Sequence, residues 1–277
     1  QKVLPRLEAR LAATCYAGDA FPWADPLSQG LAAIQAAYHG APYAVDADTL
    51  TGWAGALIEG WEGRPALAPD TDNPWWQATL RLLDAGARQG GERWCAAIPD
   101  LQGGGEILAL LRGSERLALD LLDRPDEIGA AIREINAAWR YYFDACYAAI
   151  HRWQPGYVDW LGIWSERPAA TVECDYMVMV SPRMFERFFL PGIAEQVDMV
   201  ERSLFHLDGP GAIKHLEMLL ARPRLRGIQW VPTPERARAT DWLALFQRIQ
   251  AAGKRVIINC AAADLETILD ALRPELL

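Results

Sequence analysis

The sequence predicts an α/β fold, a (β/α)8 TIM barrel with an N-terminal helical extension. Three observations support this class. From residue 92 onward, short runs rich in β-branched and aromatic residues alternate with longer stretches of helical periodicity. Strands that alternate with crossover helices require a parallel sheet. The chain has 277 residues, slightly above the ~250 residues typical of the closed barrel. We therefore expect one domain over residues 1–277, with residues 1–91 forming a cap and the first strands.

An open, doubly wound sheet is the alternative, because it has the same alternation of strand and helix and commonly binds nucleotides. No G-x-G-x-x-G follows an early strand, and no Walker A sequence is present. The glycine run at residues 103–105 lacks both the required spacing and a lysine. The barrel is therefore favoured. The chain stops at residues 274–277, where a final strand would begin, which is consistent with a truncated barrel.

The expected strands are short runs bounded by turn residues. They lie at residues 93–98, 157–164, 171–178, 203–207, 225–231 and 255–259. The expected helices lie between them. A helix carrying Ile107, Leu108 and Leu111 follows the first of these strands, and a shorter helix at 212–220 follows the strand at 203–207.

Two long helices are expected in the middle of the chain, and a third follows the strand at 225–231. The first spans residues 124–152, where Pro125 suits the first helical position and apolar residues recur every three or four positions. The second spans 182–202 and should bend at Pro191, because an internal proline removes a backbone hydrogen bond. The third has Trp242, Leu245, Phe246 and Ile249 on one apolar stripe.

Composition and charge narrow the classes of partner. Hydrophobic residues make up 51% of the chain and charged residues 23%, which is typical of a globular protein. The net charge of −9 disfavours nucleic acid and anionic membranes. No apolar run reaches the ~20 residues of a membrane span. The five cysteines form no C-x-x-C, which favours a reducing, cytoplasmic compartment. Twelve tryptophans suggest that some of them line a pocket.

In a barrel, the residues that follow the carboxyl ends of the strands meet at one mouth. The residues at such positions are Asp100, Trp160, Trp164, Glu173, Cys174, Asp175, His206, Asp208, Trp230 and Cys260. The mouth is therefore the expected site of any chemistry.

His206 and Asp208 stand two residues apart at a strand end, so both side chains should point to the same face. They could form a metal-binding or acid/base pair. Alternatively, His206 is hydrogen-bonded to the barrel rim and Asp208 caps the next helix. Cys260 follows another apolar strand and is either a thiolate ligand or a small buried hydrophobe. Histidine, cysteine and carboxylate together suit Zn²⁺.

Four carboxylates, Asp100, Glu173, Asp175 and Asp208, would share the mouth. Repulsion between like charges should raise the pKa of at least one of them, which suits a proton donor or a cationic substrate. The alternative is that they are surface carboxylates or helix N-caps. We expect the mouth to favour neutral or cationic small molecules over polyanions.

Four aromatic residues, Trp160, Trp164, Tyr176 and Trp230, could form the walls of this mouth. Such walls bind a methylated ammonium through cation–π attraction, or stack on a sugar or a tetrapyrrole. The alternative is that these side chains fill the space between barrel and cap.

Five segments resemble the uroporphyrinogen decarboxylase superfamily. They are PDL at 99–101, ILALLRG at 107–113, SPRMF at 181–185, FHLDGPG at 205–211 and GIQWVP at 227–232. Within that superfamily the sequence resembles a bacterial uroporphyrinogen-decarboxylase-like branch that is related to corrinoid-dependent methyltransferases. The resemblance covers nearly the whole chain. It implies a (β/α)8 barrel with the active site in its C-terminal mouth.

The resemblance also implies a ligand set. Decarboxylase members bind substrate carboxylates through an arginine-rich N-terminal motif, whereas residues 16–22 here contain no arginine. Methyltransferase members hold zinc with an H-x-C motif and a later cysteine. His206 matches the histidine, Asp208 replaces the first cysteine, and Cys260 falls where the late ligand is expected. The implied zinc site is His206 and Cys260 with a carboxylate from Asp208, Glu173 or Asp175.

The expected function is methyl transfer from a small methylated substrate, with a corrinoid carried by a separate protein. The first alternative is a metal-independent decarboxylase or other lyase that uses an aspartate and His206 as acid/base groups. The second alternative, from a different class, is a non-catalytic protein that binds a sugar or an amine in a tryptophan-rich mouth.

Overall fold

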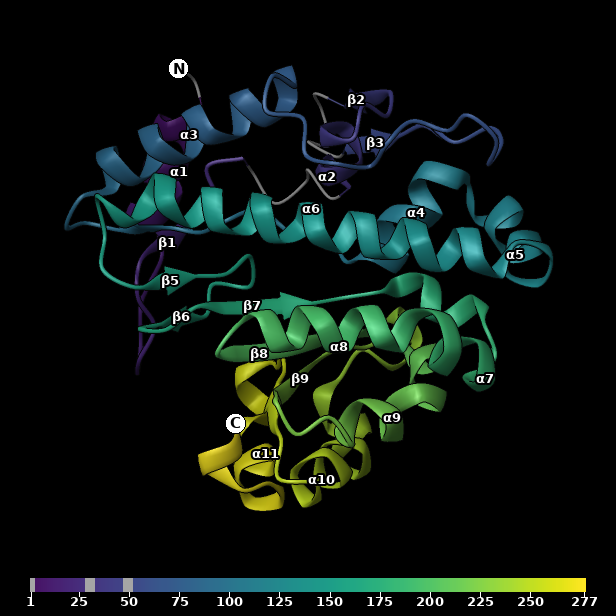
Figure 1. Ribbon diagram of the computed structural model, residues 1–277. Helices are drawn as coiled ribbons and strands as arrows, with labels where there is room; N and C mark the ends of the chain where they lie inside the picture. The colour runs from purple at the N-terminus through teal and green to yellow at the C-terminus, as the bar shows by residue number, and fades with distance from the viewer. Residues whose placement is uncertain (1–2, 28–32, 47–51) are drawn as a thin grey trace. The chain divides into compact units, whose positions relative to one another are not determined.

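The computed structural model describes residues 3–27, 33–46 and 52–277. The chain forms two compact units, Gln1–Ala169 (unit 1) and Ala170–Leu277 (unit 2), both built from helices and short strands (Figure 1). The structure confirms the predicted α/β class and the parallel pairing of strands. The expected single domain stays a prediction.

The helices of unit 1 are α1 (Val3–Ala12), α2 (Ile34–Tyr38), α3 (Pro74–Gly90), α4 (Gly104–Arg112), α5 (Ser114–Asp123) and α6 (Pro125–His151). Its strands are β1 (Trp23–Ala24), β2 (Tyr43–Val45), β3 (Gly52–Ala54), β4 (Cys95–Ala96), β5 (Tyr157–Val158) and β6 (Trp164–Ser165). The strand β7 (Ala169–Val172) begins at the last residue of unit 1.

The long helix α6 organises unit 1, and its range confirms the helix predicted at 124–152 (Figure 1). Pro125 occupies the first turn, where its missing N–H costs nothing. Asp126 and Glu127 follow it and interact favourably with the positive end of the helix dipole. One face of α6 is buried from Ile128 to Ile150, and α3, α4 and α5 pack against this helix.

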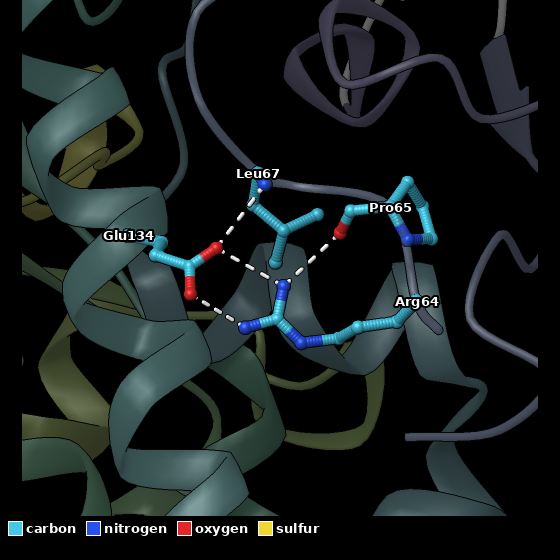
Figure 2. A network of polar contacts seen from close by, with 4 residues as sticks. All are labelled: Arg64, Pro65, Leu67 and Glu134. Carbon is cyan, nitrogen blue, oxygen red and sulfur yellow. Dashed lines mark hydrogen bonds and ion pairs between the residues drawn. The ribbon is translucent and has the colours of Figure 1, made fainter. Parts of the chain in front are cut away.

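An ion pair fastens the loop after β3 to α6, as Figure 2 shows. Arg64 donates two parallel hydrogen bonds to Glu134, from Nη2 at 2.5 Å and from Nη1 at 3.0 Å. The backbone N–H of Leu67 also donates to Glu134, at 3.2 Å. The bonds from Arg64 lower the pKa of Glu134, so this carboxylate stays charged and holds the loop.

The cap of α3 links this helix to α2. The side-chain oxygen of Asn73 accepts hydrogen bonds from Trp75 N–H at 2.9 Å and Trp76 N–H at 3.1 Å. Its amide nitrogen donates to the carbonyl of Ala37 at 2.8 Å. One buried side chain therefore starts α3 and fixes the end of α2 beside it.

The strands of unit 1 are shorter than the sequence predicts. Only Cys95–Ala96 of the run at 93–98 forms a strand, β4, which pairs in parallel with β1. The backbone N–H of Ile98 then bonds to the carbonyl of Val158 at 3.1 Å, so β5 lies next to the segment that follows β4. The carboxyl ends of β1 and β4 therefore point the same way, as the barrel prediction requires.

The strand predicted at 157–164 is instead an antiparallel hairpin of β5 and β6. Asp159 causes the turn, because its Oδ1 accepts from Leu161 N–H at 3.1 Å and from Ile163 N–H at 2.9 Å. Gly162 completes the turn with a φ of +80°, a conformation that a side chain disfavours.

The helical segments of unit 2 are η1 (Asp175–Met179), α7 (Pro182–Met184), η2 (Phe185–Phe189), α8 (Leu190–Met199), η3 (Pro210–His215), α9 (Leu216–Leu220), η4 (Pro234–Arg236), η5 (Ala239–Trp242), α10 (Leu243–Ala251), η6 (Ala262–Asp264), α11 (Leu265–Ala271) and η7 (Pro274–Leu276). Its strands after β7 are β8 (Arg202–Asp208), β9 (Leu225–Val231) and β10 (Arg255–Ile257).

One four-stranded sheet, with the order β10-β9-β8-β7, forms the core of unit 2. The β8–β9 and β9–β10 pairs are parallel, and consecutive strands are neighbours, as in a singly wound barrel. The predicted strands at 203–207 and 225–231 are confirmed. In the described ranges the sheets remain separate, so closure of a barrel is not shown. No helix in these ranges is long and apolar enough to cross a membrane.

Two expectations in unit 2 need correction. The run at 171–178 is not one strand: β7 ends at Val172, and the apolar residues after Asp175 form the short helix η1. Short apolar runs fit a buried helix as well as a buried strand, so the pattern could not distinguish them. The helix predicted at 182–202 ends at Met199, and a π-helical segment, η2, directly precedes α8, whose second residue is Pro191.

Candidate functional site

The carboxyl end of β8 presents two polar side chains on one face of the sheet. Phe205 and Leu207 are fully buried, whereas the alternating residues His206 and Asp208 are partly exposed. Alternation along the strand places His206 and Asp208 together on the opposite face from the two apolar residues. Gly209 follows with a φ of +74°, which lets the chain turn away directly after Asp208.

Asp175 reaches the same place from η1, the short helix that follows β7. Two side chains of η3 hold η1 in position. Lys214 Nζ donates to the carbonyl of Val178 at 2.8 Å, and His215 Nε2 donates to the carbonyl of Met177 at 2.9 Å. Since η3 begins two residues after β8 ends, these bonds bring Asp175 next to the end of β8.

Asp175, His206 and Asp208 form a compact group, which we call the His–carboxylate cluster. Each offers one nitrogen or carboxylate oxygen, and these three atoms lie within 4.8 Å of one another. All three residues belong to unit 2. The three side chains that form the cluster therefore lie within one unit.

The electrostatics of Asp175 distinguish it within the cluster. Its Oδ1 is buried and has no hydrogen-bond partner in the part of the chain that the structure describes. Burial raises the pKa of Asp175; attraction to His206 opposes this rise, and repulsion from Asp208 adds to it. Asp175 is therefore suited to hold a proton or to accept a cation in its place.

A glutamine from the neighbouring strand contacts His206. In the register of β8 and β9, His206 is opposite Gln229. The imidazole Nδ1 is hydrogen-bonded to Gln229 Oε1, and Gln229 Nε2 donates to the carbonyl of Trp230 at 3.3 Å. Because Oε1 can only accept, Nδ1 must carry the proton. In the neutral ring the lone pair then resides on Nε2.

Not every predicted residue of unit 2 joins the cluster. Glu173 is buried directly after β7, and Tyr176 is buried with its ring centroid 5.8 Å from that of Phe189. Cys260 is exposed beyond the end of β10 and is not a member of the cluster. The structure groups His206 with Asp175 and Asp208, two of the three carboxylates that the predicted zinc site named, and the role of Cys260 as a ligand stays a prediction.

Trp230 lies on the other face of the sheet. It is opposite Leu207 in the register and adjacent to Gln229 in β9, so its side chain points away from His206. Its ring packs against Trp242, with the centroids 4.7 Å apart. The expectation that Trp230 lines the same pocket as His206 does not fit this arrangement, because the expectation ignored the alternation along β9.

Three predicted residues belong to unit 1. Asp100 is partly buried after β4, Trp160 is partly buried in the turn between β5 and β6, and Trp164 begins β6 with 43% of its surface exposed. Their roles in substrate binding or catalysis stay predictions.

The sequence analysis missed Gln229, Lys214 and His215. The signal for Gln229 was a single amide flanked by apolar residues at 227–231. A polar residue in such a strand needs a partner, and the neighbouring strand supplies it. Nothing in the sequence indicated what Lys214 and His215 bind. Both side chains donate to backbone carbonyls of η1, an element predicted as a strand.

No protein-family model matches this chain, and no curated protein is similar to it in sequence. Solved structures do match it. One is a methyltransferase from Methanosarcina mazei, with a TM-score of 0.54 and 11% sequence identity. The similarity covers 86% of this chain and 76% of that chain. At this identity the similarity shows the fold alone, and membership of the uroporphyrinogen decarboxylase superfamily stays a prediction.

Proposed function

We propose that this chain is a methyltransferase that acts on a small methylated substrate, with the His–carboxylate cluster as its reaction centre. The observation that carries the proposal is the convergence of Asp175, His206 and Asp208 within 4.8 Å at the carboxyl end of a parallel strand. In α/β folds with parallel strands, ligands bind at that end of the sheet. The fold shared with the methyltransferase structure supports the same reaction class.

Methyl transfer makes one demand that the cluster can meet. The bond between the methyl carbon and its heteroatom breaks, the electron pair stays on the heteroatom, and the carbon bonds to a nucleophilic acceptor. In a neutral donor, negative charge therefore develops on the heteroatom and must be stabilised. We assign the acceptor to a corrinoid on a separate protein.

A divalent cation would supply that stabilisation. Zn²⁺ fits the cluster because it accepts imidazole nitrogen and carboxylate oxygen. The unpartnered Oδ1 of Asp175 fits a ligand position. Asp175, His206 through Nε2, and Asp208 would hold the ion, which would act as a Lewis acid on the substrate heteroatom. Binding would displace the proton of Asp175, since ligands must be deprotonated.

Two negative side chains also define the class of substrate. Asp175 and Asp208 would balance the charge of a bound Zn²⁺, so the loaded cluster would have no net positive charge to attract polyanions. A neutral donor such as a methylated amine, alcohol or ether therefore fits best.

The direct test is a demethylation assay on the zinc-loaded protein, using methyl donors of these three classes and reduced cobalamin as the acceptor. Mass spectrometry would measure the demethylated product. We expect at least one donor to react, and we expect Asp175→Asn, His206→Asn and Asp208→Asn to lower the rate by about 100-fold or more. Glu217→Gln, the same carboxylate-to-amide change on an exposed residue of α9, should leave the rate unchanged. Failure of every donor, or equal rates in the cluster variants, would contradict the proposal.

A metal-independent decarboxylase or lyase is the second candidate, favoured by the raised pKa of Asp175. Here Asp175 would deliver a proton to the carbanion left by carbon dioxide, and His206 would stabilise the adjacent charge. Release of carbon dioxide from carboxylated substrates by metal-stripped protein would favour this candidate over methyl transfer.

A further inference from the structure

We propose that Gln229 is a positioning residue that keeps the proton of His206 on Nδ1 and thereby makes Nε2 the nitrogen that acts in the cluster. This inference deepens the proposed function and rests on it for its consequence in catalysis. The placement of the proton itself can be measured without substrate or metal.

The geometry of Gln229 is determined by its neighbours. The side chain is 4% exposed, so it cannot exchange its partners for bulk water. Its Nε2 donates to the carbonyl of Trp230 at 3.3 Å, which turns Oε1 toward His206. The opposite orientation of the amide would direct Oε1 at the Trp230 carbonyl, and two acceptors would then face each other.

The parallel register enforces the pairing of the two side chains. His206 and Gln229 are register partners on adjacent strands, and both are on the face opposite Leu207 and Trp230. A side chain that packs beside a histidine and offers it only an acceptor selects one tautomer of the neutral ring. The orientation of the ring and the position of its proton are thereby set by β9, not by the cluster itself.

The consequence for the cluster concerns which nitrogen carries the lone pair. A metal or a substrate proton can be bound only by the unprotonated nitrogen of a neutral imidazole. With Nδ1 protonated toward Gln229, that nitrogen is Nε2. Loss of the acceptor would allow the ring to place its proton on Nε2, which would block this position.

His215 provides an internal reference for the opposite tautomer. Its Nε2 is bonded to the carbonyl of Met177, so the proton must reside on Nε2. The chain has only four histidines, and the His206→Asn variant identifies the signals of His206. Nitrogen-15 NMR of the imidazole rings can therefore report both tautomers in one sample.

The experiment is to record these spectra at about pH 8.5, where an ordinary histidine with a pKa near 6.5 is neutral, on metal-free protein. The wild type should show the proton of His206 on Nδ1 and that of His215 on Nε2. Gln229→Leu should shift His206 toward the Nε2–H form and leave His215 unchanged. Gln229→Glu retains an acceptor and should keep the wild-type tautomer.

The matched control is Gln250→Leu, the same change at a buried glutamine whose partner is the backbone of Arg273. It should leave His206 unchanged. A wild-type proton on Nε2 of His206, or an unchanged tautomer in Gln229→Leu, would overturn the inference. If Gln229→Leu fails to fold, the spectra of the wild type and of Gln229→Glu still show which nitrogen of His206 carries the proton.

Activity then separates the two proposals. If the wild type demethylates a donor, Gln229→Leu should lower that rate about 10–100-fold and Gln229→Glu should restore much of it. If no donor reacts but the tautomers are as expected, the proposed function fails while the role of Gln229 as a positioning residue stands.

Discussion

At the scale of single residues, the cluster shows how burial and neighbours give similar side chains different properties. Asp175 and Asp208 are both aspartates of one site, yet burial raises the pKa of Asp175, whereas Asp208 ends a strand at a partly exposed position. The sequence could predict that His206 and Asp208 share a face, because they are two positions apart in one strand. The partner Gln229 depends on the register between two strands, which no local pattern encodes.

A buried carboxyl group in unit 1 predicts how stability depends on pH. Asp25 is 6% exposed, and burial raises its pKa to about 7, opposed by the bond from Leu27 N–H and by Arg10. The folded state therefore holds a proton that the unfolded chain, with an aspartate pKa near 3.9, releases. Between about pH 4 and pH 7 the free energy of unfolding should fall as the pH rises.

Asp25→Asn should remove this dependence and stabilise the protein at pH 8 by a few kcal/mol, because the amide never ionises. Urea denaturation at pH 5 and pH 8, followed by tryptophan fluorescence, measures the difference. Asp270→Asn, at an exposed position of α11, is the control and should change neither value. An Asp25→Asn variant with the wild-type pH dependence would show that Asp25 does not ionise in this range.

At the scale of elements, long periodic segments were predictable and short ones were not. The helix α6 has enough apolar repeats to be recognised, and β8 and β9 are apolar runs between clear turn signals. The two-residue strands β1 and β4 leave no such pattern. The element η1 was predicted as a strand because its residues are apolar, and two of its carbonyls accept hydrogen bonds from Lys214 and His215, which are distant in sequence.

The contact between α4 and α5 yields a prediction about a buried ion pair. Arg112 donates from Nε to Asp120 at 2.5 Å, and both side chains are only 10% exposed. Arg112 Nη1 also donates to the carbonyls of Ile58 at 3.0 Å and Glu59 at 2.5 Å. Arg112→Met should lower the free energy of unfolding by about 3–5 kcal/mol, because Asp120 would remain as a buried, unpaired charge.

Urea denaturation of Arg112→Met, Arg112→Met/Asp120→Leu and Arg124→Met would check this. The double variant should recover part of the loss, since it removes the unpaired charge. Arg124 pairs with Glu127 at exposed positions, so Arg124→Met should change stability by no more than about 0.5 kcal/mol. If Arg112→Met and Arg124→Met lowered the free energy of unfolding equally, the buried ion pair of Arg112 and Asp120 would be no more important for stability than an exposed pair.

At the scale of the whole molecule, the sequence predicted the α/β class and parallel strands, while barrel closure stays a prediction. The consecutive order β7 to β10 agrees with a barrel. The predicted zinc site paired His206 with Cys260 on the basis of a family resemblance. It also named Asp175 and Asp208 as possible carboxylate ligands, and the structure places both beside His206, while zinc itself and the role of Cys260 stay predictions.

The ligand set of bound zinc tests the role of the His–carboxylate cluster most directly. X-ray absorption spectroscopy at the zinc edge, on protein loaded with one equivalent of Zn²⁺, separates nitrogen and oxygen ligands at about 2.0–2.2 Å from sulfur at about 2.3 Å. We expect a shell of nitrogen and oxygen only, and its loss in Asp175→Asn, whereas Cys260→Ser should bind zinc like the wild type. A sulfur ligand that disappears in Cys260→Ser, or a wild-type protein that retains no zinc, would contradict the assignment of Asp175, His206 and Asp208 as the metal-binding reaction centre.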